Sequence, residues 1–531
     1  MTRFRLLLLF TLLAGLFIPV TNLGAQDTDD NVNWWQDRVF YEIFVRSFYD
    51  SDGDGIGDLR GITEQLDYLQ GLGITGLWLM PISPSPSYHG YDVTDYRAIN
   101  PDYGTMDDFR ELLDEAQARG IAIIIDLVIN HASVEHPWFI DSAASPESEF
   151  RDWFIWAEED PGYRGPDSQV VWHGRNNTYY YGVFWSGMPD LNYENPAVTA
   201  EMYDIARFWL EDVGVDGFRL DAIKHIVEEG RIQENTLSTR RWMADFREYV
   251  NSVNPNALLI GEVWSSSTMA APYTDTAVDI VFEFDLATAI LSATGLGVSS
   301  SIRTQMNTIL NLYPDQQYAT FITNHDQNRV MSQLRGNVDA AKAAASVLLT
   351  LPGVPFIYYG EEIGMTGTKP DPEIRTPMQW NDDSAQVGFT SGTAWMTIND
   401  DWQDGVTVSA QDDDPDSLLN HYRRMIALRN NTPALQRGSY IAAEGGAGTV
   451  LSFLRQTDEQ TVLVIINLRN REIENYGIMI EANTLPAEGE VRVLFGTDEA
   501  ITQPDFSDGG FSDYKPLDSL PPLAVLVIEM P

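Results

Sequence analysis

The sequence has 531 residues, of which 44 % are hydrophobic and 11 % aromatic, so it is long enough for about two or three folded domains and too apolar for a disordered chain. Its formal net charge of −45 disfavours binding to nucleic acid and to anionic membranes. Because it contains 0 cysteines, disulfides, thiol catalysis and thiolate metal ligands are excluded, and a large core or a bound metal must supply its stability.

The N-terminus has the features of a secretory signal peptide. Arg3 and Arg5 precede an almost continuous apolar run at residues 6–20. This run is shorter than the ~20 apolar residues that span a bilayer, and retention as an uncleaved anchor is the alternative. The sequence therefore predicts a signal peptide at residues 1–25, an acidic linker at 26–33, and a secreted, extracellular protein without a membrane segment in its mature form.

Short β-rich runs alternate with amphipathic, helix-like stretches along most of the remaining chain. The predicted strands are residues 39–45, 74–80, 121–128, 217–220, 258–263, 279–284, 318–323 and 354–359. The predicted helices include residues 62–72, 106–119, 196–213, 239–253, 302–312 and 338–349. Strand-helix alternation repeated eight times predicts an α/β protein built on a (β/α)₈ TIM barrel, in which functional residues follow the carboxyl ends of the strands.

Two segments depart from this alternation. The connection after the third predicted strand, residues 131–192, is far longer than an ordinary loop and is rich in Trp, Tyr, Gly and Asn, which indicates an inserted subdomain that forms the wall of a cleft. From residue 433 the helical pattern gives way to short alternating runs, which predict a C-terminal all-β sandwich domain at 433–531. The barrel is then expected at residues 34–130 and 193–432.

Polar residues lie at the carboxyl ends of four of the predicted strands. They are His131, Arg219, Asp221, Glu262, His325 and Asp326. Each of them taken singly could be a helix cap or an ordinary loop residue. In a barrel, however, the carboxyl ends of the strands meet at one rim, so these side chains are expected to lie together.

The pair of carboxylates at the fourth and fifth strand ends suits the cleavage of a glycosidic bond. Arg219 lies two residues before Asp221, on the same face of the strand, and its guanidinium is expected to lower the pKa of that carboxyl and keep it ionised as a nucleophile. Glu262 follows an apolar run and lies near Trp264, so partial desolvation should raise its pKa and make it the general acid. Asp326 is then expected to bind sugar hydroxyls.

Four ordered motifs resemble those of the α-amylase family, glycoside hydrolase family thirteen, along nearly the whole chain from Trp34. They are Asp126 to His131, Gly217 to His225, Gly261 to Trp264 and Phe321 to Asp326. The resemblance implies that Asp221 is the nucleophile of a retaining mechanism, Glu262 the acid/base and Asp326 the stabiliser of the transition state. His131, Arg219 and His325 resemble the polar contacts at the cleaved sugar.

Further segments resemble particular branches of this family. The segment from His89 to Asp92 is similar to the one that supplies a stacking tyrosine, here Tyr91, and Arg375 lies in a motif similar to that of oligo-1,6-glucosidases and trehalose synthases. Residues 188–192 look intermediate between oligo-1,6-glucosidases and neopullulanases. Lys224 and His225 resemble the pair that contacts the leaving-group sugars in true α-amylases, and His89 suggests a cleft open to longer chains.

The loop at residues 50–58 places an aspartate at alternate positions around glycines, a pattern that offers oxygen ligands to a hard cation. An acidic, solvated turn is the alternative. The resemblance to oligo-1,6-glucosidases and their relatives, which hold calcium in this loop, implies the ligands Asp50, Asp52, Asp54, Asp58 and the backbone carbonyl of Ile56. Asn130 resembles the residue that binds a second calcium in many α-amylases.

Taken together, these features predict an α-amylase that hydrolyses α-1,4-glucosidic bonds inside starch and malto-oligosaccharides with retention. The sequence leaves its oligomeric state open, with a monomer favoured. The alternatives within the same chemistry are an exo-acting α-glucosidase or oligo-1,6-glucosidase, a neopullulanase and a trehalose synthase. Whether Asp92 and Arg375 close the non-reducing end, or Lys224 and His225 extend the leaving-group side, separates these possibilities. An inactive relative that only binds sugar would have lost a catalytic carboxylate, and all three are present.

Overall fold

The computed structural model describes residues 33–313 and 316–531, so the predicted signal peptide and nearly all of the predicted linker lie outside the described residues. The fold below is that of the compact unit Trp35–Pro531. In the described part of the chain, no helix is both long and apolar enough to cross a membrane.

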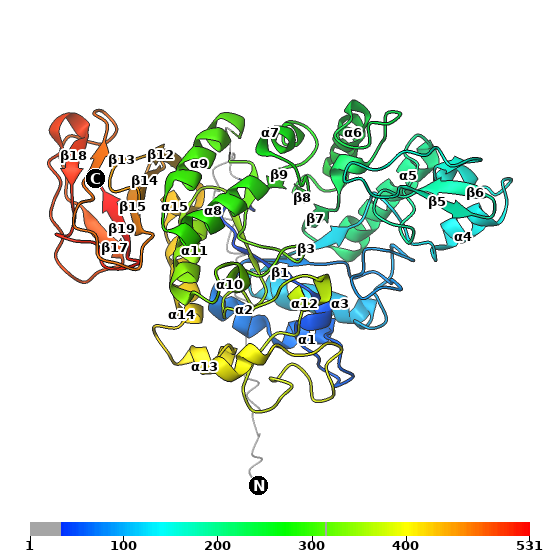
Figure 1. Ribbon diagram of the computed structural model, residues 1–531, viewed down its shortest axis with the longest axis horizontal. Helices are drawn as coiled ribbons and strands as arrows, with labels where there is room; N and C mark the ends of the chain where they lie inside the picture. Colours follow the sequence, from blue (N-terminus) through cyan, green and yellow to red (C-terminus); the bar gives the residue numbers. More distant parts are fainter. Residues whose placement is uncertain (1–32, 314–315) are drawn as a thin grey trace, which may run out of the picture. The chain divides into compact units, whose positions relative to one another are not determined.

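Eight parallel strands close into a barrel (Figure 1). They are β1 (Phe40–Ile43), β2 (Gly76–Leu79), β3 (Ala122–Leu127), β7 (Gly217–Leu220), β8 (Leu258–Gly261), β9 (Ile280–Phe282), β10 (Tyr318–Thr320) and β11 (Val354–Tyr358). The first strand pairs with both β2 and β11, which closes the ring. Each strand lies inside its predicted range, so the predicted barrel is confirmed.

Helices follow the strands of the barrel. The longer ones are α1 (Leu59–Glu64), α2 (Leu66–Leu72), α3 (Met106–Ala118), α5 (Pro196–Arg207), α6 (Leu237–Val253), α8 (Phe284–Leu296), α9 (Ser300–Leu312), α11 (Val338–Thr350) and α14 (Leu418–Asn430). Short helices in the connections are η1 (Val45–Ser47), η4 (Ile223–His225), α7 (Ser267–Ala270), η5 (Ala271–Tyr273), α10 (Val330–Gln333), α12 (Asp371–Ile374), η6 (Asp400–Asp404) and α13 (Val408–Asp412).

The helix boundaries follow local side-chain chemistry. Thr105 and Asp108 form a reciprocal capping box at the start of α3, and Asn195 caps α5 just before Pro196 at its first position. Two predicted helices are corrected. The stretch 62–72 is two helices that meet at Gln65, and the stretch 196–213 continues beyond α5 as the π-helix η3 (Phe208–Val213).

Sequence periodicity missed α8 because this helix is buried on several sides. Its buried residues include Leu286, Ala287, Ile290 and Ala293, so no polar stripe alternates with an apolar one. A helix of this kind gives a continuous apolar run that resembles a buried strand as much as a helix.

The predicted insert is an irregular region with its own small sheet. It contains α4 (Pro137–Ala144), η2 (Arg151–Trp153), and the strands β4 (Trp156–Ala157), β5 (Trp172–Arg175) and β6 (Thr178–Tyr181) in the order β4-β6-β5. Single β-bridges from His131 to Asp190 and from Phe154 to Leu191 join the start of the insert to its end. The insert thus leaves the barrel after β3 and returns to it before α5.

The C-terminal region is built from antiparallel strands, coloured orange and red in Figure 1. One sheet holds β12 (Ser439–Ala442), β14 (Val450–Gln456), β15 (Thr461–Asn467), β19 (Val525–Met530) and β17 (Arg492–Phe495), and the other holds β13 (Glu444–Gly445), β16 (Ile478–Ile480) and β18 (Phe511–Tyr514). Side chains from both sheets share one apolar core, as a sandwich requires. A short helix, α15 (Pro433–Arg437), precedes the first strand, so helical structure extends past the predicted end at residue 433.

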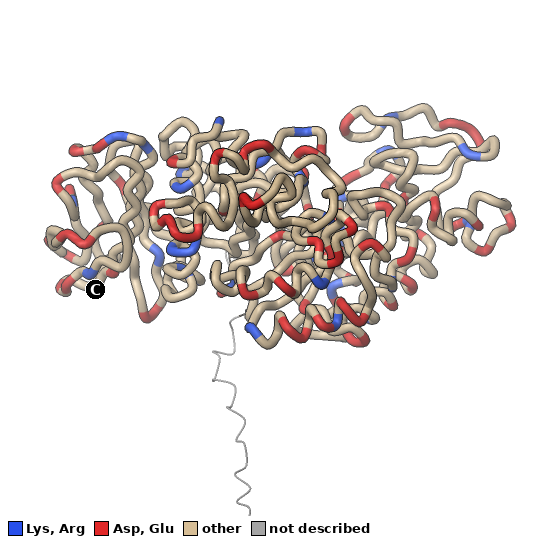
Figure 2. Tube along the Cα trace, turned by 90° about the horizontal axis from the view of Figure 1, so that it is seen from below, with Lys and Arg blue, Asp and Glu red and all other residues tan. Residues whose placement is uncertain are grey.

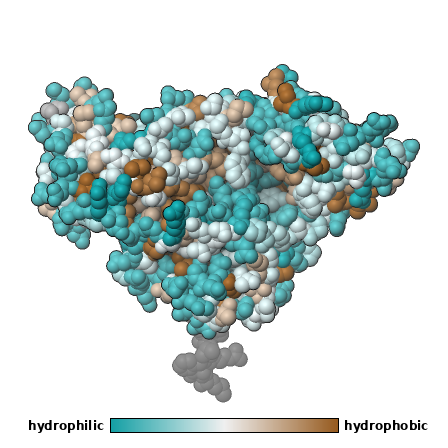
Figure 3. All heavy atoms as spheres, viewed as in Figure 1, coloured by the Kyte–Doolittle hydropathy of each residue, from teal (hydrophilic) through white to brown (hydrophobic). Residues whose placement is uncertain are grey.

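The surface reflects the acidic composition of the sequence. Asp and Glu positions are spread along the whole described trace in Figure 2, with Lys and Arg far fewer. The face drawn in Figure 3 is mainly hydrophilic, and its apolar residues form small separate patches. Charge of one sign over so much surface favours solubility.

We expect Gly217→Ala to destabilise the barrel, because Gly217 opens β7 where β7 lies close to β8. A Cβ atom at this position would lie 2.1 Å from the carbonyl oxygen of Leu258, with φ at 154°. The added Cβ atom would clash with the backbone of β8, which cannot move aside within the barrel. The free energy of unfolding should therefore fall by about 2 kcal/mol or more. Gly71→Ala in α2 is the control, since nothing lies within 4 Å of its Cβ position. Equal denaturation midpoints for the two variants would contradict this explanation.

Candidate active site

Three carboxylates from neighbouring strands surround one buried guanidinium, that of Arg219 on β7. Its Nη1 lies 2.9 Å from each carboxylate oxygen of Asp126 and 2.7 Å from Oδ1 of Asp221. Its Nη2 lies 2.9 Å from Oε2 of Glu262, which directly follows β8. Arg219 is only 1 % exposed, so water does not screen these contacts.

The chain turns sharply after the predicted nucleophile. Ala222 has φ 50° and ψ 35°, a left-handed conformation that costs a non-glycine residue about 1–2 kcal/mol. The turn aims the N–H of Ala222 at Oε2 of Glu262, 3.0 Å away. The backbone N–H next to Asp221 therefore fixes the carboxylate of Glu262, and the positions of the two predicted catalytic carboxyls are coupled.

Burial governs the protonation of this cluster. It raises the pKa of Asp221, and the opposing effect of Arg219 does not reverse the direction, so the expectation of a lowered pKa was wrong. Burial also raises the pKa of Glu262, as the sequence predicted. The pKa of Asp126 rises to about 7 for the same reason. Buried acids packed around one positive charge cannot all ionise at low cost, which favours a shared proton in the cluster.

The third predicted carboxylate, Asp326, is held from both sides by positive groups. Its Oδ2 lies 3.0 Å from Nε2 of His325, and its Oδ1 lies 2.9 Å from Nη2 of Arg375. Burial alone would raise the pKa of Asp326, but these two cations outweigh it and hold the pKa well below its ordinary value. Asp326 is therefore ionised while its side chain remains 25 % exposed at the rim.

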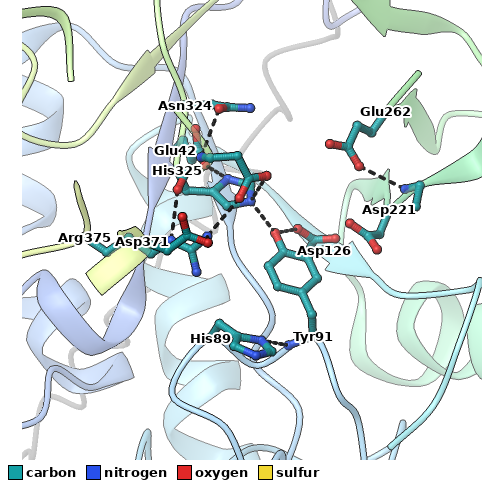
Figure 4. A network of polar contacts seen from close by, with 12 residues as sticks. Glu42, His89, Tyr91, Asp126, Asp221, Glu262, Asn324, His325, Asp371 and Arg375 are labelled. Atoms are coloured by element: carbon teal, nitrogen blue, oxygen red, sulfur yellow. Dashed lines mark hydrogen bonds and ion pairs between the residues drawn. The ribbon is translucent and has the colours of Figure 1, made fainter. Parts of the chain in front are cut away.

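Tyr91 links the two carboxylate groups (Figure 4). Its hydroxyl lies 2.9 Å from Oδ2 of Asp126 and 2.8 Å from Nε2 of His325. Its backbone N–H donates to Nδ1 of His89, and its carbonyl oxygen lies 3.1 Å from Nε2 of His131. Burial lowers the pKa of His131 to about 4, so this imidazole is neutral at pH 7.

Asp92 and Arg375, the pair expected at the non-reducing end, have separate partners. The hydroxyls of Ser85 and Ser87 both donate to Oδ1 of Asp92. Arg375 donates from Nε to the carbonyl oxygen of His325 at 2.9 Å, and its Nη2 reaches Oδ2 of Asp371 at 3.5 Å in addition to Asp326. The structure thus brings Asp92 and Arg375 to the same site without an ion pair between them.

On the opposite side, Lys224 lies at the rim. Its Nζ lies 2.8 Å from Oε2 of Glu234 and 3.1 Å from the carbonyl oxygen of Trp264. His225 is 6 % exposed, and its Nδ1 lies 2.8 Å from the carbonyl oxygen of Gln233. The predicted contact of His225 with sugar is therefore limited to a small exposed part of the ring.

The amide of Asn130 joins the barrel to the loop after β7. Its Nδ2 donates to the carbonyl oxygen of His225 at 2.8 Å, and its Oδ1 lies 3.2 Å from Nδ1 of His131. Both ends of the amide have protein partners, so the resemblance to a second calcium site receives no support from these contacts.

Sequence reasoning missed three members of the site. Glu42 on β1 lies 2.5 Å from Nδ1 of His325, Asp126 on β3 binds Arg219, and Asp371 on α12 reaches Arg375. A signal was present for the first two, because each is a single acidic residue inside an otherwise apolar strand. Asp371 opens the short helix α12, outside the strands, and carries no such signal.

The loop at residues 50–58 gathers three of its aspartates. The ligand atoms of Asp50, Asp52 and Asp58 all lie within 4.8 Å of one another. Asp54 is not one of these three; its Oδ1 accepts the N–H of Ile56, and its role as a ligand stays a prediction. The partners found for Asp50 and Asp58 are backbone amides and hydroxyls, and burial raises the pKa of Asp58. No basic side chain of residues 33–313 or 316–531 forms an ion pair with these three aspartates, and clustered carboxylates of this kind fit a divalent cation such as calcium.

Comparisons with known proteins identify the family of the chain. The family described as "Alpha amylase, catalytic domain" matches residues 42–438. The chain is 41 % identical to alpha-amylase 3 of Dictyoglomus thermophilum, in an alignment that covers 83 % of this chain and 87 % of the relative. It is 33 % identical to oligo-1,6-glucosidase of Parageobacillus thermoglucosidasius, in an alignment that covers 82 % of this chain and 91 % of that relative. The crystal structure of an alpha-amylase from H. orenii is similar with a TM-score of 0.81 and 42 % identity, over 93 % of this chain and 99 % of that one.

We expect calcium to raise the melting temperature and a chelator to lower it. Calcium at 100 times its Kd would add about 2.7 kcal/mol of stability if only the folded chain binds it. Asp52→Asn should abolish this response, because Asp52 belongs to the carboxylate group, whereas Asp54→Asn should retain it. Differential scanning calorimetry with and without calcium measures both. A response lost in Asp54→Asn and kept in Asp52→Asn would contradict the assignment.

Proposed function

The chain belongs to the α-amylase family of retaining glycoside hydrolases, and we propose that it is a secreted α-amylase that cleaves α-1,4-glucosidic bonds inside starch and malto-oligosaccharides. Family membership fixes the reaction class. The substrate chain length and the point of attack are our proposal, and they are supported by the side chains on the two sides of the catalytic carboxylates.

The proposed reaction proceeds by two displacements. Asp221 attacks the anomeric carbon, and Glu262, whose pKa is raised by burial, gives its proton to the departing glycosidic oxygen. The bond to the leaving sugar breaks as the bond to Asp221 forms. Glu262 then takes a proton from water, which attacks the same carbon and releases Asp221. Arg219 contacts both carboxyls and restrains their positions through both steps.

The observation that supports internal cleavage is the separation of Asp92 and Arg375 into different polar contacts. Among the residues that the structure describes, Asp92 and Arg375 form no ion pair, because serine hydroxyls hold one and Asp326 and Asp371 hold the other. A closed pair would form a wall behind a single terminal sugar. Without that wall, a glucan chain can continue past the cleaved unit.

Aromatic side chains on the leaving-group side support the same proposal. Phe184, Trp185 and Trp264 are 41 %, 49 % and 44 % exposed, which is unusual for such large apolar groups. Phe184 packs edge-on against both His131 and His225. Exposed flat rings beside the catalytic residues suit stacking with further sugar units.

Calcium, secretion and a monomeric state complete the proposal. Calcium at Asp50, Asp52 and Asp58 would brace the loop against Thr390, which donates to Asp50, and against Trp395, whose N–H donates to Gly55. Trp395 stacks on Tyr88, which packs against His89, so this loop supports the non-reducing side of the site. Secretion rests on the signal-like residues 1–25.

Exo-action is the second candidate. The motif that contains Arg375 and the 33 % identity to a protein named oligo-1,6-glucosidase favour it. In that case a rearranged Asp92 and Arg375 would meet around the terminal sugar.

The sizes of the first products separate the two candidates. Amylose should give a ladder of malto-oligosaccharides within the first few per cent of hydrolysis, with a steep loss of iodine staining, because an internal cut shortens chains quickly. Chromatography of timed samples measures this. Glucose as the sole early product would overturn the proposal of internal cleavage.

We expect Asp221→Asn to reduce kcat by at least about 10³-fold, because an amide is a poor nucleophile. The fold should survive, since asparagine keeps the shape of the side chain and Arg219 keeps Asp126 and Glu262 as charged partners. Hydrolysis rates and a thermal melt measure the two effects, and Asp54→Asn, outside the catalytic cluster, is the control. Undiminished turnover in Asp221→Asn would refute the nucleophile assignment.

A further inference from the structure

His325 has an acidic partner on each of its ring nitrogens. Nδ1 lies 2.5 Å from Oε1 of Glu42, and Nε2 lies 3.0 Å from Oδ2 of Asp326. Nε2 also lies 2.8 Å from the hydroxyl of Tyr91, whose own proton is within reach of Asp126. Glu42 and His325 are 2 % and 1 % exposed, so water does not compete for these contacts. Figure 4 shows the glutamate and the imidazole side by side.

We propose that Glu42 is a positioning residue of the glycosidase reaction: through Nδ1 of His325 it orients the opposite edge of the imidazole toward Asp326 and Tyr91. The inference rests on the glycoside hydrolase chemistry of the family and not on internal or terminal cleavage. Among the described residues, no hydrogen bond or ion pair joins the side chain of Glu42 to a catalytic carboxylate, so Glu42 acts through the histidine.

His325 must donate a hydrogen bond from each ring nitrogen, which requires the charged form of the imidazole. A neutral imidazole carries one N–H, but Glu42 and Asp326 are acceptors on opposite nitrogens of His325, so both nitrogens must donate. Imidazolium between two carboxylates satisfies all of these atoms. A neutral ring would leave either Glu42 or Asp326 facing a lone pair in a buried site, which costs free energy.

The groups that face His325 come from several elements. The acidic ones are Glu42 on β1, Asp126 on β3, Asp221 after β7 and Asp326 after β10; the phenol is that of Tyr91; and Arg375 donates to the carbonyl oxygen of His325. The indole of Trp78 on β2 packs edge-on against the ring. Burial lowers the pKa of His325, but Asp326 and Glu42 outweigh it and raise the pKa to about 9.

The folded pKa of His325 is above its ordinary value, so the imidazolium persists at neutral pH and is lost as the pH rises through about 9. Without the charge of Glu42, the pKa of His325 must fall. The imidazolium that donates to Asp326 would then lose its proton at a lower pH than in the wild type. Asp326 would lose with it the orientation in which it meets the sugar.

Glu42→Gln tests this, because glutamine keeps the shape and an acceptor oxygen while removing the charge. We expect the alkaline limb of the kcat/KM profile on amylose and on a short chromogenic maltoside to move about 1–2 units to lower pH, with kcat affected more than KM. Glu283→Gln is the matched control, since Glu283 is also buried and bonds Ser267 and Gln305 instead. Its profile should equal that of the wild type.

A second measurement does not depend on the variant's folding. Nitrogen-15 NMR of the wild-type histidines, assigned with His325→Asn, should show both nitrogens of His325 protonated at pH 7. A neutral ring there overturns the proposal, as does an unshifted profile in a folded Glu42→Gln. If the wild type cleaves neither substrate, the proposed function fails first, while the NMR result still decides the state of His325.

Discussion

The ion pairs of Arg219 tie together three strands of the barrel, since its guanidinium contacts Asp126 on β3, Asp221 after β7 and Glu262 after β8. Taking such charges out of water costs several kcal/mol per ion, and only close contacts offset that cost. The barrel provides these contacts because adjacent parallel strands end at one rim. The catalytic carboxyls are therefore placed by the same contacts that make their burial tolerable.

A second centre of charge lies across the barrel at His325. Glu42, His325, Asp326 and Arg375 alternate in sign, so each charge has an opposite neighbour. The hydroxyl of Tyr91 joins this chain to Asp126 and so to the first cluster. The two clusters differ in their effect on acids, because burial dominates around Arg219 and raises carboxyl pKa values, whereas cations dominate at Asp326 and lower its pKa. One site thus contains acids suited to opposite protonation states.

The parts outside the barrel shape access to this rim. The insert supplies Phe184 and Trp185, while the loop after β11 supplies Asp371 and Arg375. The acidic loop at residues 50–58 supports Tyr88 through Trp395. The rigid strands thus carry the chemistry and the connections decide which sugars reach it, a division that suits a family whose members share a mechanism and differ in substrate.

The sequence by itself determined the eight strands, the order of the strand-end motifs and the family, because strand alternation and residues adjacent in the chain are local properties. It could not place Glu42, which meets His325 from 283 positions away in the chain. It also gave the wrong direction for the pKa of Asp221, since the neighbouring Arg219 is visible in the sequence and the depth of burial is not. Partners distant in sequence and the loss of water are produced only when the barrel closes, and for this reason the tertiary structure alone decided the protonation and orientation of the site.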